Sequence, residues 1–178
     1  MAKRPTLQTL IKRADSAQLR QLVGELCRLS PENRRYVELL LSPGHEADPT
    51  EIIAAACKAI EKKFNTYGER VDLRGARKVV TDTVKVLRGF PLEAAEIKLV
   101  YVEIGTNFTL EYGDLYESFY DSLLSMLENF CRDIEREPGM HGYFAEHLQR
   151  LRRKARNIGW GYGDQVDFLV GRLADLTD

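Results

Sequence analysis

The chain has 178 residues, of which 44% are hydrophobic, and its formal net charge at pH 7 is −1. This length suits one domain or a small domain with an appendage, and the apolar fraction is sufficient for a core. The net charge excludes a uniformly basic nucleic-acid-binding protein, but residues 1–89 carry +6 and residues 90–178 carry −7. The asymmetry indicates either complementary solvent-exposed faces or a basic N-terminal surface for an anionic partner.

Cysteine usage and the N-terminus both indicate a cytoplasmic protein. Cys27, Cys57 and Cys131 are odd in number and widely spaced, which is typical of reduced thiols in an intracellular protein. The first ten residues lack the apolar stretch of a signal peptide. No apolar run approaches the roughly 20 residues of a membrane helix.

The first 44 residues predict three short helices, over 5–14, over 16–29 and from Pro31 onward. Asp15 and Ser30 are helix-capping residues, and Pro31 suits a first helical turn. A linker follows at 42–47, so we treat 1–44 as a three-helix segment and 45–178 as a domain of helical pairs; one continuous domain is the alternative. Apolar residues at helical spacing are expected to face inward. They are Leu7, Leu10, Ile11, Leu19, Leu22, Val23, Leu26, Leu29, Tyr36, Val37, Leu40 and Leu41.

The longest apolar periodicity lies in residues 91–137, which predict two long antiparallel helices joined at 112–114. Gly105 leaves room for close helix approach, and Gly113 suits the left-handed position after a helix. Asp114 is expected to cap the second helix, with Glu117 at its third position. The expected core residues are Leu99, Tyr101, Ile104, Phe108, Phe119, Leu123, Leu127 and Phe130.

Two further helices precede this pair, over about 48–64 and 72–87, and two follow it, over about 140–158 and from Asp164. No stretch has the alternation of a β-hairpin. We therefore expect an all-α protein of eight or nine helices, stacked as antiparallel pairs in an α-solenoid-like array or an irregular bundle. Trp160 lies in the glycine-rich segment 159–163, and we expect its ring to pack near Leu127 or Phe130. The alternative is an exposed aromatic platform.

The helix over 91–112 has one polar ridge, formed by Glu96, Glu103, Asn107 and Glu111. It faces solvent or, alternatively, lines a ligand pocket whose buried charges need partners. The candidate binding residues are Glu103, Asn107, Glu111, Tyr112, Tyr116 and Trp160.

The acidic residues near the hairpin turn, Glu111, Asp114, Glu117 and Asp121, are interpreted as helix caps and a solvated face rather than as a metal site. We find no catalytic motif and predict no cofactor.

The basic run at 149–156 offers a third surface. Its arginines could contact phosphates, but cations are also favourable near the C-terminus of a helix. The nucleic-acid alternative rests on Arg150, Arg152, Arg153 and Arg156.

Several blocks are similar to a known family. LSPENRRYVELLL at 29–41 follows two leucine-rich segments, YVEIGTNFTLEYGDLYESFYDSLLSMLENF occupies 101–130 and NIGWGYGD occupies 157–164. Together they resemble a family of small uncharacterised bacterial helical proteins, catalogued only as a domain of unknown function. The resemblance covers most of the chain and implies a bacterial, cytoplasmic, all-α protein, but it supplies no activity.

The function expected from the sequence is a helical module that binds another protein or acts as a scaffold. A small-ligand sensor or enzyme using the polar ridge is the first alternative. Nucleic-acid binding through the basic run is the second.

Overall fold

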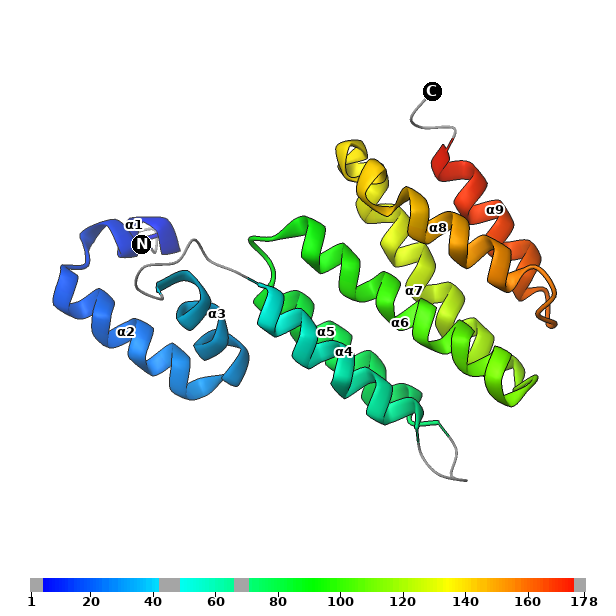
Figure 1. Ribbon diagram of the computed structural model, residues 1–178. Coiled ribbons are helices and arrows are strands. Elements are labelled where there is room, and N and C mark those ends of the chain that lie inside the picture. Colours follow the sequence, from blue (N-terminus) through cyan, green and yellow to red (C-terminus); the bar gives the residue numbers. More distant parts are fainter. Residues whose placement is uncertain (1–4, 42–48, 66–70, 175–178) are drawn as a thin grey trace. The chain divides into compact units, whose positions relative to one another are not determined.

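The computed structural model describes residues 5–41, 49–65 and 71–174, and these ranges contain helices and no strand (Figure 1). The all-α prediction is confirmed. No helix in these ranges is long and apolar enough to cross a membrane. The helices are α1 (Leu7–Arg13), α2 (Ser16–Leu29), α3 (Pro31–Leu41), α4 (Thr50–Phe64), α5 (Leu73–Val86), α6 (Pro91–Tyr112), α7 (Glu117–Arg136), α8 (His141–Ala155) and α9 (Tyr162–Ala174), with a 3₁₀ turn at Pro138–Met140.

The chain divides into two compact units, Met1–Asp48 and Pro49–Asp178. The boundary expected from the sequence, after residue 44, falls in 42–48, which lie outside the described residues. We call these parts the N-terminal unit and the C-terminal unit.

The N-terminal unit forms its helices where the sequence predicts them. The Asp15 carboxylate accepts a hydrogen bond from the Gln18 backbone N–H at 2.8 Å, and the Gln18 side chain accepts one from the Asp15 N–H, which completes a capping box. Ser30 caps α3 by accepting from the Asn33 N–H at 3.2 Å. Local sequence signals are therefore sufficient for these helix starts.

The expected burial of the N-terminal unit is wrong. Among its described residues only Leu39 is buried. Helix α2 packs against α3, but two helices in contact cover only part of each apolar stripe. The apolar periodicity predicts which face of each helix is to be buried, but it does not identify the surface that buries it. The exposed large apolar residues are Leu7, Leu10, Ile11, Leu22, Val23, Leu26, Leu29, Leu40 and Leu41.

The C-terminal unit is a stack of three antiparallel hairpins, α4–α5, α6–α7 and α8–α9 (Figure 1). Within this stack α6 packs against α4 on one side and α8 on the other, and α7 packs against α9. Helix α6 is thus nearly surrounded by other helices, as its two apolar stripes predict.

The contact between α6 and α7 depends on Gly105. A Cβ atom at this position would overlap the side chain of Leu123, which is fully buried. Six of the eight expected core residues are buried. Ile104 and Phe108 are only partly buried, because they pack at the edge of the core rather than inside it.

The predicted starts of α7 and α9 need correction. Helix α7 begins at Glu117 with Tyr116 as its N-cap, so Asp114 does not cap it. Instead, the Asp114 carboxylate accepts a hydrogen bond from the Tyr120 hydroxyl at 2.9 Å. Helix α9 begins at Tyr162, which places Asp164 in its first turn. Neither helix therefore begins where the sequence predicts.

The expected packing of Trp160 is also wrong. Its side chain is 59% exposed, and its backbone has a φ of 57°, in the left-handed region that residues other than glycine seldom adopt. Tyr162 supplies the buried ring of this connection: it is fully buried, and its hydroxyl lies 2.6 Å from Thr106 Oγ1 on α6. Of the two large rings in this connection, Tyr162 packs in the core and Trp160 is exposed.

Candidate functional site

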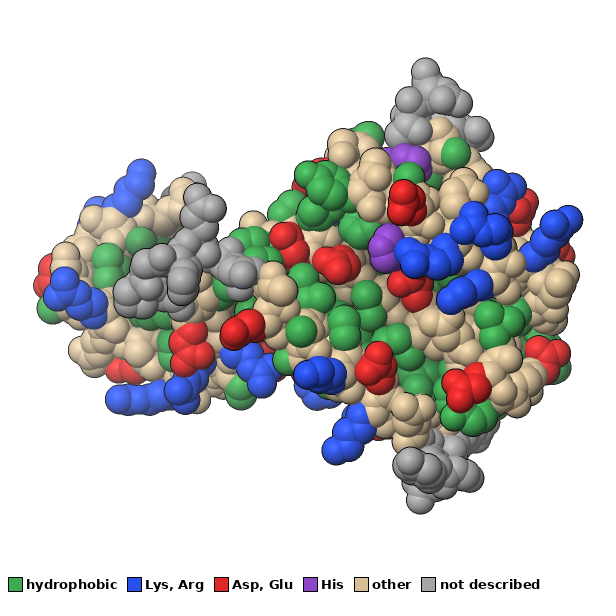
Figure 2. Space-filling view, viewed as in Figure 1, with side chains coloured by type: hydrophobic (Ala, Val, Ile, Leu, Met, Phe, Trp, Pro, Cys, Tyr) green, Lys and Arg blue, Asp and Glu red, His purple; other side chains and the backbone are tan. Residues whose placement is uncertain are grey.

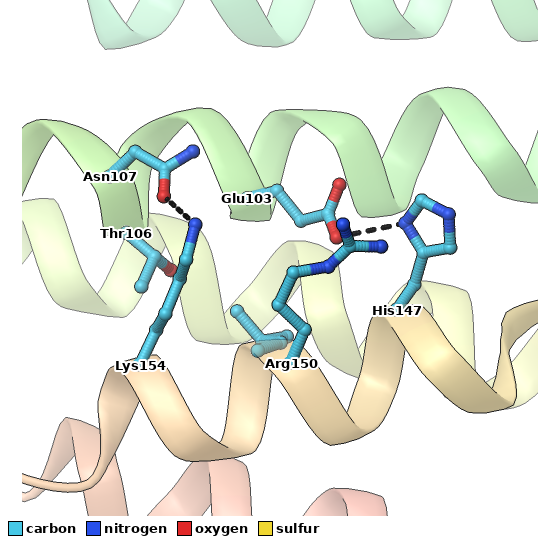
Figure 3. Close-up of a pocket in the computed structure, with 7 residues that line it drawn as sticks. Glu103, Thr106, Asn107, His147, Arg150 and Lys154 are labelled. Atoms are coloured by element: carbon cyan, nitrogen blue, oxygen red, sulfur yellow. Dashed lines mark hydrogen bonds and ion pairs between the residues drawn. The ribbon is translucent and has the colours of Figure 1, made fainter.

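The polar ridge of α6 faces α8. His147 Nδ1 on α8 lies 3.0 Å from Glu103 Oε1, and Lys154 Nζ donates to Asn107 Oδ1 at 2.6 Å (Figure 3). Residue numbers increase in the same direction along both helices, so α6 and α8 run parallel here. The two contacts are seven residues apart on α8 but only four apart on α6. The difference arises because the long Lys154 side chain reaches back toward the N-terminus of α8.

Two adjoining hollows lie along this contact, and we call them together the α6–α8 groove. One, of about 130 Å³, lies between Glu103 and Asn107 on α6 and Arg150 and Lys154 on α8. The other, of about 190 Å³, is mainly apolar. Glu103 and His147 line both hollows. The apolar hollow is walled by Leu92, Leu99, Val100, Tyr143 and Phe144, with Glu96 beside them.

Charge is unevenly distributed along the groove. Burial, followed by the nearby negative charge of Glu93 and Glu103, raises the pKa of the half-buried Glu96 carboxyl, and His147 partly offsets this. The other end is basic. On the face shown in Figure 2, Lys and Arg side chains gather beside a histidine over α8, with acidic side chains next to them. The groove is therefore acidic and apolar at one end and basic at the other.

The structure brings together only part of the predicted binding set. Glu103 and Asn107 line the groove. Glu111 is exposed at the end of α6, and Tyr112, which is 61% exposed, stacks on Phe108 with ring centroids 4.5 Å apart. Tyr116 packs edge-on against Phe119 at 6.1 Å. Glu111, Tyr112, Tyr116 and the exposed Trp160 do not line the groove.

Three of the four arginines of the basic run share one hollow, and Arg150 lies apart from them. Arg150 lines the α6–α8 groove. Arg152 forms an ion pair with Asp167 of α9. Arg152, Arg153 and Arg156 line a separate open hollow together with Asp164 and Asp167. Interleaved carboxylates reduce the positive potential that a phosphate backbone needs, and the nucleic-acid alternative stays a prediction without geometric support.

Three groove residues, Tyr143, His147 and Lys154, were absent from every predicted site. They could not be assigned because their relevance depends on which face of α8 meets α6. A weak signal existed: His147, Arg150 and Lys154 recur at three- and four-residue steps, so they share one face of a helix.

The groove pairs the His147 imidazole with the Glu103 carboxylate. A histidine held by a carboxylate resembles a general base, yet the one hydroxyl on the smaller hollow, Thr106 Oγ1, is already bonded to the Val102 carbonyl and the Tyr162 hydroxyl. No group of three or more metal-ligating side chains occurs within 5–41, 49–65 and 71–174.

Comparison with known proteins supplies no relative: no family model, curated protein or solved structure matches the chain. The resemblance to the bacterial helical family therefore stays a prediction. Two surfaces stand out in the described residues, namely the uncovered apolar faces of the N-terminal unit and the α6–α8 groove.

Proposed function

We propose that the protein is a self-associating scaffold, in which the N-terminal unit of one chain docks on the same unit of a second copy. The observation that carries the proposal is the state of that unit, where nine large apolar side chains are exposed and one described residue is buried. Domains near or below roughly 40 residues usually rely on disulfides, metals or association. Its cysteine, Cys27, is a free thiol, which leaves association.

The energy available is of the right size. Burying a half-exposed leucine contributes on the order of 1 kcal/mol. Nine such side chains in each of two copies would contribute on the order of 10–20 kcal/mol, which offsets an association cost of roughly 4–15 kcal/mol. A second copy is the occupant we favour, because interfaces that complete a core are usually the apolar faces of homodimers. A second copy also presents the same apolar face, so each chain can bury the exposed side chains of the other.

The cytoplasmic location expected from the sequence belongs to the same proposal. Its support is that Cys27, Cys57 and Cys131 are all free thiols. Burial raises the pKa of the Cys131 thiol to about 12, so this cysteine behaves as a small apolar core residue rather than as a reactive group.

Sedimentation equilibrium of the full chain over a dilution series tests the self-association. We expect a dimer at high concentration that dissociates toward the 20.4 kDa monomer on dilution. Leu26→Glu should raise the dissociation constant at least about 100-fold, since an unpaired carboxylate in an apolar interface costs several kcal/mol.

The matched control is Ala17→Glu, which adds the same charge to α2 at an exposed position outside the apolar stripe. It should leave the dimer intact. A wild-type chain that sediments as a monomer at every concentration would contradict the proposal, as would a Leu26→Glu variant that still dimerises. If the apolar face instead binds a different protein, the purified wild-type chain should sediment as a monomer at every concentration.

A further inference from the structure

Two charged groups in the α6–α8 groove lack a counter-charge. Glu96 lines the apolar hollow and is half-buried, and it forms no hydrogen bond or ion pair with a described residue. The Arg150 guanidinium likewise has no such partner, and Lys154 bonds only to the neutral amide of Asn107. Neither Glu96 nor Arg150 therefore has an ion-pair partner among the described residues, although Glu103 and His147 lie between them.

The spacing of these groups limits what can join them. Glu96 and Glu103 are seven residues apart on one helix, which places them on the order of 10 Å apart along its axis. Arg150 begins about one turn beyond His147, and its side chain reaches back toward the Glu103–His147 pair (Figure 3). Glu103 and Arg150 line the same small hollow, so a ligand that reaches from Glu96 into this hollow spans on the order of 10 Å.

The shape of the groove favours an extended ligand. Each hollow, at about 130 Å³ and 190 Å³, is smaller than the roughly 300–1,000 Å³ of a typical ligand pocket. A ligand that occupies both hollows passes the Glu103–His147 pair, which lines the two. Its middle can be polar, whereas the end near Glu96 meets aromatic and aliphatic walls.

We propose that the α6–α8 groove binds a short peptide with free termini, about three residues long, since an extended chain spans roughly 3.3–3.6 Å per residue. Its N-terminal ammonium pairs with Glu96, and its apolar first side chain enters the hollow beside Tyr143 and Phe144. Its C-terminal carboxylate binds Arg150 and Lys154. This site lies in the C-terminal unit and does not depend on the self-association proposed above.

Other ligand classes fit less well. A single amino acid holds its charges only a few ångströms apart, too close to reach Glu96 and Arg150 together. A phosphate or nucleotide would bind Arg150 and Lys154 but would leave Glu96 uncompensated. A tail of a folded protein has the carboxylate and lacks the free amine. A test of the proposal therefore has to measure the contribution of each terminus of the peptide by itself.

Isothermal titration calorimetry of the full chain with the tripeptide Leu-Gly-Gly provides the test. We expect saturable binding at a single site. Acetylation of the amine and amidation of the carboxylate should each weaken binding by about tenfold, the loss of one moderately exposed charged contact. Glu96→Gln should bind the free and the acetylated peptide with equal affinity. Arg150→Ala should bind the free and the amidated peptide with equal affinity.

Matched controls use the same substitutions outside the groove. Glu146→Gln and Arg153→Ala alter exposed residues of α8 that do not line either hollow, so both variants should bind like the wild type. The absence of heat with all three peptides would overturn the proposal. Equal affinity for the free and acetylated peptides would also overturn it, and would point to the C-terminus of another protein. Binding that Glu96→Gln and Arg150→Ala leave unchanged would locate the peptide elsewhere and overturn it as well.

Discussion

The two units begin helices in the same way and bury them very differently. Asp15 in the N-terminal unit and Asp72 in the C-terminal unit each cap a helix of 14 residues, and each accepts from the backbone N–H three residues later at 2.8 Å. Helix α2 nevertheless has no buried residue, whereas α5 buries four. Equal local geometry thus coexists with unequal burial.

The difference separates two kinds of information in a helix sequence. A cap and a 3.6-residue apolar period say where a helix begins and which face needs cover. Neighbouring helices decide whether that face is covered, and in the C-terminal unit they do so in three stacked hairpins. Stability comes mainly from that cover, so substitutions should affect the two units unequally.

Phe119→Ala should produce the largest effect. The side chain is fully buried, and its ring lies 5.4 Å from Tyr120 and 6.1 Å from Phe64, which joins α7 to α4. Loss of the ring should lower the free energy of unfolding by about 3–5 kcal/mol through lost transfer energy and a residual cavity. Chemical denaturation followed by circular dichroism measures it.

The control is Phe168→Ala, at a position that is 62% exposed on α9. This change should stay within about 0.5 kcal/mol of the wild type. Equal losses from the two variants would mean that the core does not lie where the structure places it.

Gly105→Ala should destabilise the C-terminal unit by about 1–3 kcal/mol, since its methyl group overlaps the buried Leu123 side chain. An alanine at Gly171, near the C-terminal end of α9, meets nothing within 4 Å and should instead add about 0.5–1 kcal/mol, because alanine favours the helix. Thermal unfolding of both variants compares the signs. A stabilising Gly105→Ala would refute the close contact of α6 and α7.

Much of the fold could be predicted from local signals. Asp15 and Asp72 cap where expected, Gly113 follows α6 with a φ of 89°, and Gly105 lies where α6 and α7 approach closely. These features depend on residues close in the sequence or on one small side chain. The physical causes of the two caps and of the turn at Gly113 are visible without knowledge of the tertiary contacts.

The candidate site could be predicted only in part. The ridge of α6 was visible as Glu103 and Asn107 on one face, but its partners His147 and Lys154 lie more than 40 residues away. Which face of α8 meets α6 depends on the stacking of whole hairpins. The choice between Trp160 and Tyr162 as the buried ring depended likewise on a tertiary partner, the Thr106 hydroxyl.

Removal of the two matched caps tests the comparison directly. Asp72→Ala should lower the free energy of unfolding of the C-terminal unit by about 1 kcal/mol, with loss of the Gly75 hydrogen bond and of the ion pair to Lys63. Asp15→Ala should reduce helix content in the N-terminal unit and leave the main unfolding transition unchanged. Circular dichroism measures the helix content, and calorimetry measures the main unfolding transition. If Asp15→Ala shifted the main transition, the two units would unfold cooperatively rather than independently.

The smallest expected effect concerns Glu96 and connects stability with binding. Because the folded state raises the pKa of this carboxyl above its ordinary value of 4.5, the ionised group destabilises the fold at neutral pH. Glu96→Gln should therefore have a higher melting temperature than the wild type at pH 7. The difference should shrink as the pH falls through the folded-state pKa and vanish below the unfolded one, where both forms are neutral. Glu146→Gln, at an exposed position of α8, is the matched control for the substitution itself.

The sign of this effect separates a binding residue from a structural one. If Glu96 were retained for stability, its replacement would lower the melting temperature. If it is retained to meet the ammonium of a bound peptide, Glu96→Gln should stabilise the free protein and weaken the peptide complex together, as is common where a site keeps an uncompensated charge. A bound peptide should then raise the melting temperature of the wild type more than that of the variant. A variant that loses both stability and binding would instead assign Glu96 to the fold.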